Sequence, residues 1–131
     1  MRNGNGQRQC EFGFTLVELL VVLSILALLL SLAYPKYFSN VERAKEAALK
    51  ETLNTTREAI DQFYADHGKY PDSLEEVVEK KYITKLPFDP VADSAESWVL
   101  DQPEPPLEGM VYDIHSGAVG NAIDGSEYST W

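Results

Sequence analysis

Residues 14–34 have the sequence FTLVELLVVLSILALLLSLAY, and Pro35 follows directly. This stretch contains a single charged residue, Glu18. A helix of this length, at about 1.5 Å rise per residue, matches the ~30 Å hydrocarbon core of a bilayer. We therefore expect a membrane-spanning helix over 14–34. A charged side chain inside such a helix costs roughly 2.5–3.5 kcal/mol on insertion scales, so Glu18 requires a partner or a function.

The segments on either side of this stretch differ in charge. Residues 1–13 are polar and carry Arg2 and Arg8, which predicts a short lead-in that stays in the cytoplasm. The whole chain of 131 residues has a net charge of −10, and no basic patch follows Pro35. We therefore expect no nucleic-acid partner, and no anionic lipid bound to the soluble part. The single cysteine excludes a disulfide within the chain.

Two common interpretations of residues 1–34 are incomplete. A secretory signal peptide would be cleaved near Ser31-Leu32-Ala33, but its apolar core usually spans only ~7–15 residues and has no use for a carboxylate. An uncleaved membrane anchor has the right length but leaves Glu18 without a role. A third interpretation starts from Gly13-Phe14-Thr15-Leu16-Val17-Glu18, where a glycine at the membrane edge precedes the apolar residues and the glutamate.

That junction resembles the type IV prepilin motif. The resemblance implies that a prepilin peptidase cleaves between Gly13 and Phe14, that the new amine of Phe14 is methylated, and that Pro35 bends or locally melts the helix. The charges fit an assembly role, because an ammonium at Phe14 and the carboxylate of Glu18 lie one helical turn apart near lipid. When protomers stack with an axial stagger, Glu18 of one pairs with the amine of its neighbour, and neither charge stays unpaired.

Residues 35–67 continue the helical period in an amphipathic pattern. The charged residues lie on one face, and Glu46 and Lys50 are predicted to form an i,i+4 pair. The helix should end at His67, because Gly68 suits a left-handed cap. Residues 14–67 thus form one long predicted helix, interrupted or bent at Pro35. Its apolar face over the second half comprises Val41, Ala44, Ala48, Leu49, Leu53, Thr56, Ile60 and Phe63.

Residues 68–131 are predicted to form a small globular region. A capping box made by Ser73 and Glu76, or one residue earlier, should begin a two-turn helix that ends near Lys80. Strands are expected at 97–100 and 110–114. The predicted fold class is α+β, in which a long N-terminal helix, half membrane-spanning and half amphipathic, packs on a C-terminal domain with a short helix and a small antiparallel sheet.

The C-terminal half carries further elements in a recognisable order. They are Gly68-Lys69-Tyr70-Pro71, the short helix at Leu74, Tyr82-Ile83, Leu86-Pro87, Asp89-Pro90, Tyr112-Asp113 and a glycine-rich tail that ends on Trp131. Over residues 12–131 the chain resembles the pilin-like superfamily, and most of all the major pseudopilin of type II secretion systems. The resemblance implies a leader (1–13), a transmembrane and filament-core helix (14–34), an amphipathic helix (35–67) and a globular region (68–131).

The same resemblance implies a structural subunit of a helical homo-oligomeric filament. Its partners would be the prepilin peptidase, the inner-membrane secretion platform and minor pseudopilins. The subunit would cross the bacterial inner membrane once, with its C-terminal domain in the periplasm. A type IV pilus subunit for adhesion, motility or DNA uptake is the alternative. We expect no enzyme, because His67 and His115 have no cysteine to pair with and Ser116 lacks a G-x-S-x-G frame.

The C-terminal loop departs from the family pattern. Pseudopilins typically hold calcium there through several aspartates, whereas this chain offers Asp124 and Glu127. Calcium needs ~6–8 oxygen ligands, so two carboxylates make a poor site. We therefore expect no cofactor. We expect instead that Asp124-Gly125 is a turn and that Ser116, Tyr128 and Trp131 hold the loop by hydrogen bonds and packing.

Overall fold

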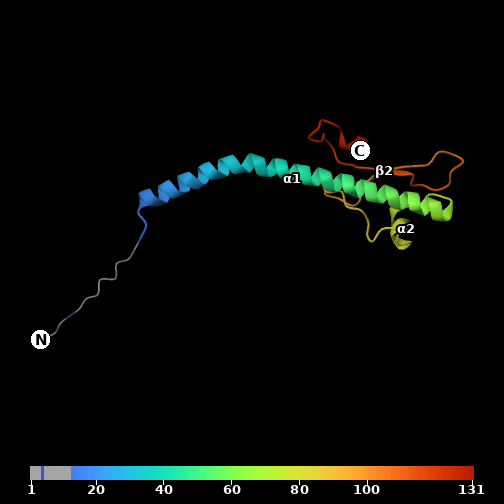
Figure 1. Cartoon of the computed structure of the whole chain (residues 1–131), viewed down its shortest axis with the longest axis horizontal. Coiled ribbons are helices and arrows are strands. Elements are labelled where there is room, and N and C mark those ends of the chain that lie inside the picture. The colour runs from blue at the N-terminus through green and yellow to red at the C-terminus, as the bar shows by residue number, and fades with distance from the viewer. Residues whose placement is uncertain (1–3, 5–12) are drawn as a thin grey trace. The chain divides into compact units, whose positions relative to one another are not determined.

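The computed structural model describes Gly4 and residues 13–131, so the rest of the predicted leader lies outside the described residues. The elements in chain order are α1 (Leu16–His67), α2 (Leu74–Glu79), β1 (Val99–Asp101), β2 (Asp113–His115) and the 3-10 helix η1 (Tyr128–Thr130) (Figure 1). The predicted α+β class is confirmed. The chain divides into two compact units, Met1–Phe38 and Ser39–Trp131.

Helix α1 has a capped start and a capped end. The hydroxyl of Thr15 accepts a hydrogen bond from the main-chain N–H of Glu18 at 3.1 Å, which caps the first turn. At the other end Gly68 has a φ of +72°, and its N–H donates to the carbonyl of Tyr64 at 2.8 Å. The predicted left-handed cap is therefore confirmed. Pro35 lies inside α1, so the helix is not interrupted there.

The part of α1 in the first unit buries none of its described side chains. Every residue from Gly13 to Phe38 is exposed, and an 18-residue window of the helix has a mean hydropathy of 2.8. The hydroxyls of Ser24 and Ser31 each donate to a carbonyl of the same helix at 2.7 Å, so they need no water. By length and composition, α1 is able to cross a membrane.

The hydrophobic core lies entirely in the second unit. Its first α1 residue is Leu49, and Val41, Ala44 and Ala48 at the start of the predicted apolar face are not buried. The hydrogen bonds from the C-terminal loop reach back along α1 to Glu46, so Val41 and Ala44 precede that contact. The buried cluster consists of Leu49, Leu53, Ile60, Tyr70, Leu74, Val111, Ile114, Ala118, Ala122 and Tyr128.

Helix α2 begins as its sequence predicts. Ser73 is the N-cap, and its hydroxyl accepts from the N–H of Glu76 at 3.2 Å. The return bond of the capping box comes from one residue earlier, because the N–H of Asp72 donates to Glu76 Oε2 at 2.7 Å. This cap turns α2 so that Leu74 and Val77 enter the core.

Strands β1 and β2 pair antiparallel, with Leu100 opposite Ile114. The predicted second strand began at residue 110, whereas β2 begins at Asp113. The reason is that the N–H groups of Met110 and Val111 both donate to the carbonyl of Pro71, at 3.1 and 2.9 Å. This part of the chain is therefore bonded to the segment that precedes α2 and not to β1.

Candidate functional site

The predicted processing site lies just before α1. Gly13 and Phe14 are exposed and non-helical, and Phe14 has 78% of its side-chain surface exposed. An exposed, irregular segment next to a small residue is the kind of backbone that a protease can bind. The predicted cleavage site between Gly13 and Phe14 is therefore exposed and outside the helix.

Glu18 lies in the first turn of α1, with its side chain exposed. Its N–H is the group capped by Thr15, so residues 15–18 form a T-x-x-E pattern that the sequence reasoning overlooked. A negative charge in the first turn also stabilises the helix, because it interacts favourably with the positive end of the helix dipole. Within residues 13–131 no cation forms an ion pair with this carboxylate. Glu18 therefore has a local role in starting the helix, and its charge remains available for a neighbour.

An aromatic cluster follows the apolar stretch, at the position of Pro35. The rings of Tyr34 and Phe38 have centroids 4.5 Å apart, and those of Tyr37 and Phe38 are 5.8 Å apart. Tyrosines at the end of an apolar span favour the membrane–water interface. The sequence signal was the spacing, since about twenty residues, or ~30 Å of helix, separate Phe14 from Tyr34.

Asp124 and Glu127, the candidate ligands of a degenerate calcium loop, bond to their own neighbours. Asp124 Oδ1 accepts from the N–H of Ser126 at 2.9 Å and from its hydroxyl at 2.6 Å. These bonds, the side-chain one first, lower the pKa of Asp124. Glu127 Oε2 accepts from the hydroxyl of Ser129 at 3.3 Å. The structure does not bring Asp124 and Glu127 together with a third carboxylate.

Two charged residues of α1, Glu46 and Lys50, contact the C-terminal loop and the end of the chain and not each other. Glu46 Oε1 accepts from the N–H of Ile123 at 2.8 Å and from the hydroxyl of Tyr128 at 2.9 Å. The Nζ of Lys50 lies 4.4 Å from the ring centroid of Trp131. The predicted Glu46–Lys50 pair is therefore wrong, and the predicted packing of Trp131 onto the domain is confirmed.

Among the described residues, one group of side chains could hold a metal ion by the closeness of its ligand atoms. It consists of Asp101, Asp113 and His115. Nε2 of His115 lies 2.8 Å from Asp101 Oδ2 and 3.6 Å from Asp113 Oδ2. Arg57 donates from Nε to Asp113 Oδ1 at 2.8 Å and brings a positive charge beside these carboxylates. The negative charge of this cluster is thus balanced in part by Arg57, and the ion pair between Arg57 and Asp113 joins α1 to the sheet. His67 is also used structurally, because its Nδ1 lies 3.1 Å from the carbonyl of Phe63.

One buried carboxylate was missed by the sequence reasoning. Asp89 is fully buried, and its Oδ1 accepts from the N–H groups of Val91 and Ala92 at 2.9 and 3.0 Å. Its Oδ2 accepts from the hydroxyl of Ser116. An Asp-Pro start to a turn is the signal that could have found it. Asp89 thereby ties the turn at 89–92 to the beginning of the C-terminal loop.

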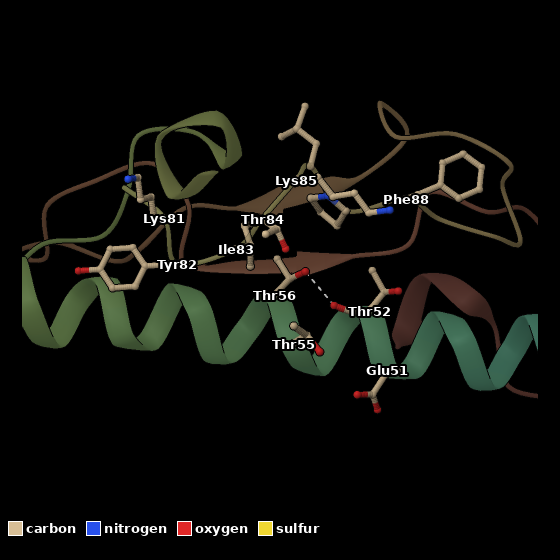
Figure 2. Close-up of a pocket in the computed structure, with 12 residues that line it drawn as sticks. Glu51, Thr52, Thr55, Thr56, Lys81, Tyr82, Ile83, Thr84, Lys85 and Phe88 are labelled. Atoms are coloured by element: carbon tan, nitrogen blue, oxygen red, sulfur yellow. Dashed lines mark hydrogen bonds between the residues drawn. The ribbon is translucent and has the colours of Figure 1, made fainter. Parts of the chain in front are cut away.

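A groove of about 530 Å³ lies between α1 and the segment 81–88 (Figure 2). Three threonines of α1 line its floor, and two of them donate to carbonyls of their own helix, Thr52 at 2.9 Å and Thr56 at 2.8 Å. Among its lining residues only Glu51, Lys81 and Lys85 carry charge. Both of these hydrogen bonds are made within α1, so the two hydroxyls serve the helix itself.

Known proteins share sequence features with this chain, beginning at its N-terminus. Residues 8–34 match the family model of the prokaryotic N-terminal methylation motif. The chain is 33% identical over 100 residues to a type II secretion system core protein G of Pseudomonas aeruginosa, covering 64% of this chain and 70% of the relative. The corresponding protein of Aeromonas hydrophila is 31% identical over 100 residues, with the same two shares.

A type IV major pilin protein of Neisseria gonorrhoeae is 33% identical over 61 residues, covering 47% of this chain and 37% of the pilin. No solved structure matches the chain. The likeness to core protein G therefore extends over more of both chains than the likeness to the pilin. With the methylation motif at its N-terminus and 33% identity over an alignment that covers 70% of a core protein G, the chain belongs to the family of type II secretion system core protein G, a branch of the type IV pilin-like proteins.

Proposed function

We propose that this chain is the pseudopilin that forms the periplasmic filament of a type II protein secretion system. The observation that carries the proposal is the 33% identity to a type II secretion system core protein G, which extends over 70% of that relative. The first unit supports a filament subunit in general, because its exposed apolar helix begins next to the Gly13–Phe14 bond and contains one carboxylate. The single helix would anchor the subunit in the bacterial inner membrane, and the unit Ser39–Trp131 would face the periplasm. The inner-membrane secretion platform and minor pseudopilins are its expected partners.

Processing would create a positive charge that can pair with the carboxylate of Glu18. Hydrolysis of the bond after Gly13 leaves a carboxylate on the leader and an amine on Phe14, which is then methylated. The amine stays cationic and lies near the N-terminal end of α1, about one turn from Glu18. In a staggered filament the amine of one subunit meets Glu18 of the next, and the pair leaves lipid together.

Structural use of the titratable residues also supports a filament subunit over an enzyme. His67 bonds to the last turn of α1, and His115 bridges the two strands and the C-terminal segment. Each histidine is thus engaged in holding the fold. A type IV pilus subunit remains the second candidate, because the apolar helix is common to both kinds of filament and the gonococcal pilin shares 33% identity over 61 residues.

The first test is the intact mass of the protein extracted from membranes. We expect the loss of residues 1–13 and the addition of one methyl group. A mature N-terminus after Ala33 would instead establish an ordinary signal peptide and refute the filament proposal. Deletion of the gene should abolish export of a secreted enzyme, whereas loss of surface pili with intact export would favour the pilus candidate.

The second test separates the charge of Glu18 from its place in the first turn. Glu18→Gln keeps the size of the side chain and the main-chain bond to Thr15 but removes the charge. We expect this variant to be cleaved and inserted normally and to form no filament. Glu18→Asp retains the charge and should restore part of the assembly, while Thr15→Ala removes the cap alone and should assemble. Normal filament yield from Glu18→Gln would contradict the charge pair.

A further inference from the structure

The C-terminal loop is held in place by a stripe of α1 side chains. Glu46 and Lys50 are one turn apart, and Arg57 follows two turns later on the same side of the helix. Glu46 bonds to the N–H of Ile123 and the hydroxyl of Tyr128, and Lys50 lies over the ring of Trp131. Arg57 donates to the carbonyl of Ile114 at 2.8 Å and to the main-chain oxygen of Trp131.

The resemblance to pseudopilins implies a calcium ion at this loop, but the oxygens present do not suit one. Asp124 and Glu127 are engaged by serine donors. The carbonyls of Ala122 and Ser126 accept hydrogen bonds from other loop N–H groups, at 2.9 and 2.7 Å. A further carboxylate at the loop, Glu46, comes from α1 and already receives two donors. Calcium requires ~6–8 oxygens that converge on one point, and this arrangement closes the loop without such a point.

We propose that Glu46 closes the C-terminal loop of this chain in place of the family's calcium ion, so that the loop keeps its shape without metal. One carboxylate oxygen satisfies a backbone donor from the loop and a phenol from the segment that follows it. Burial, together with the Glu46 carboxylate, raises the pKa of Tyr128 to about 12, so the phenol remains a donor throughout the physiological range. The contact also fixes the main chain at Ile123, which is 54% exposed.

The experiment uses the full processed chain in detergent micelles. The two tryptophans, Trp98 and Trp131, both lie in the second unit, so their fluorescence reports the melting of that unit alone. We expect the same melting temperature in chelator and in millimolar calcium. Glu46→Ala should lower the melting temperature by roughly 5–15 °C in both solutions, because two donors lose their acceptor. Glu58→Ala, an exposed glutamate on the same helix, is the matched control and should leave it unchanged.

Hydrogen exchange gives a readout that does not depend on the variant's overall stability. The amide of Ile123 should exchange slowly in the native chain and at least ~10-fold faster in Glu46→Gln, which weakens the acceptor but keeps the side-chain volume. A saturable rise in melting temperature with calcium, abolished by Asp124→Ala, would overturn the proposal, because a ligand that binds only the folded state must stabilise it. A Glu46→Ala chain that melts like Glu58→Ala would overturn it as well.

Discussion

Replacement of Arg57 by methionine tests how the second unit is joined to its long helix. The methionine keeps an aliphatic stem of similar reach but removes the guanidinium. That group makes an ion pair with Asp113 at 2.8 Å, a hydrogen bond to the carbonyl of Ile114 at 2.8 Å and another to the main-chain oxygen of Trp131. No other described side chain connects α1 to both β2 and the end of the chain in this way.

The expected loss follows from the burial of these groups. The side chains of Arg57 and Asp113 are 32% and 30% exposed, so solvent screens their ion pair, and we assign it no more than ~1 kcal/mol. Each charged hydrogen bond to a carbonyl contributes about 1.5 kcal/mol at the lower end of its range. The ion pair and the two hydrogen bonds together contribute roughly 3–4 kcal/mol. For a unit of fewer than 100 residues this corresponds to a fall in melting temperature of roughly 12–32 °C.

The assay is tryptophan fluorescence during heating and urea unfolding of the full chain in micelles. Arg43→Met is the matched control, because Arg43 lies on the same helix and is exposed. Arg57→Lys should fall between the two, since a single ammonium cannot make the forked set of bonds. If Arg57→Met unfolds at the same urea concentration as Arg43→Met, the assignment of these three bonds as the link between α1 and the sheet is refuted.

Two further predictions concern the C-terminal region. Because the folded-state pKa of Tyr128 is raised from 10.0 to about 12, its contribution to stability is complete below pH 10 and is lost as the pH rises through 12. Urea midpoints measured between pH 9 and 12 should show this loss. The loss should be smaller in Tyr128→Phe, in which only the other tyrosines with a raised pKa, Tyr70 and Tyr82, still contribute. Gly117→Ala places a Cβ 1.7 Å from the carbonyl oxygen of Ser97, so we expect a loss of at least ~3 kcal/mol in urea unfolding. A loss below ~1 kcal/mol would mean that this close approach relaxes freely.

The elements of this fold that depend on local signals were predictable from the sequence. The apolar stretch, the cap at Gly68 and the Ser73 capping box each rest on residues within a few positions of one another. The same is true of the T-x-x-E pattern that ends at Glu18, which could have been found and was not. Local chemistry determines these features because their partners are adjacent in the chain.

The contacts that hold the second unit together were not predictable in the same way. Glu46 and Lys50 have the spacing of a helical ion pair, which contributes only ~0.2–0.5 kcal/mol on an exposed surface. In the structure Glu46 instead accepts hydrogen bonds, and Lys50 contacts an aromatic ring, from residues about eighty positions away. Periodicity also placed Val41 on the apolar face of α1. Val41 is not buried, and the contact that the C-terminal loop makes with α1 at Glu46 lies further along the helix. A sequence pattern identifies the apolar face of a helix but not how far the rest of the chain extends along it.

The described residues of the first unit, in contrast, bury no side chain within the chain. Fourteen large apolar side chains from Phe14 to Leu32 are exposed, and their removal from water provides on the order of 20–40 kcal/mol. Lipid and a bundle of neighbouring helices offer this gain almost equally, so it cancels between the two environments. The charge of Glu18, which costs roughly 2.5–3.5 kcal/mol in lipid, does not cancel, because only a neighbour's amine can pair with it. Under the proposed function, the apolar residues therefore keep the helix out of water, and Glu18 selects the filament over the membrane.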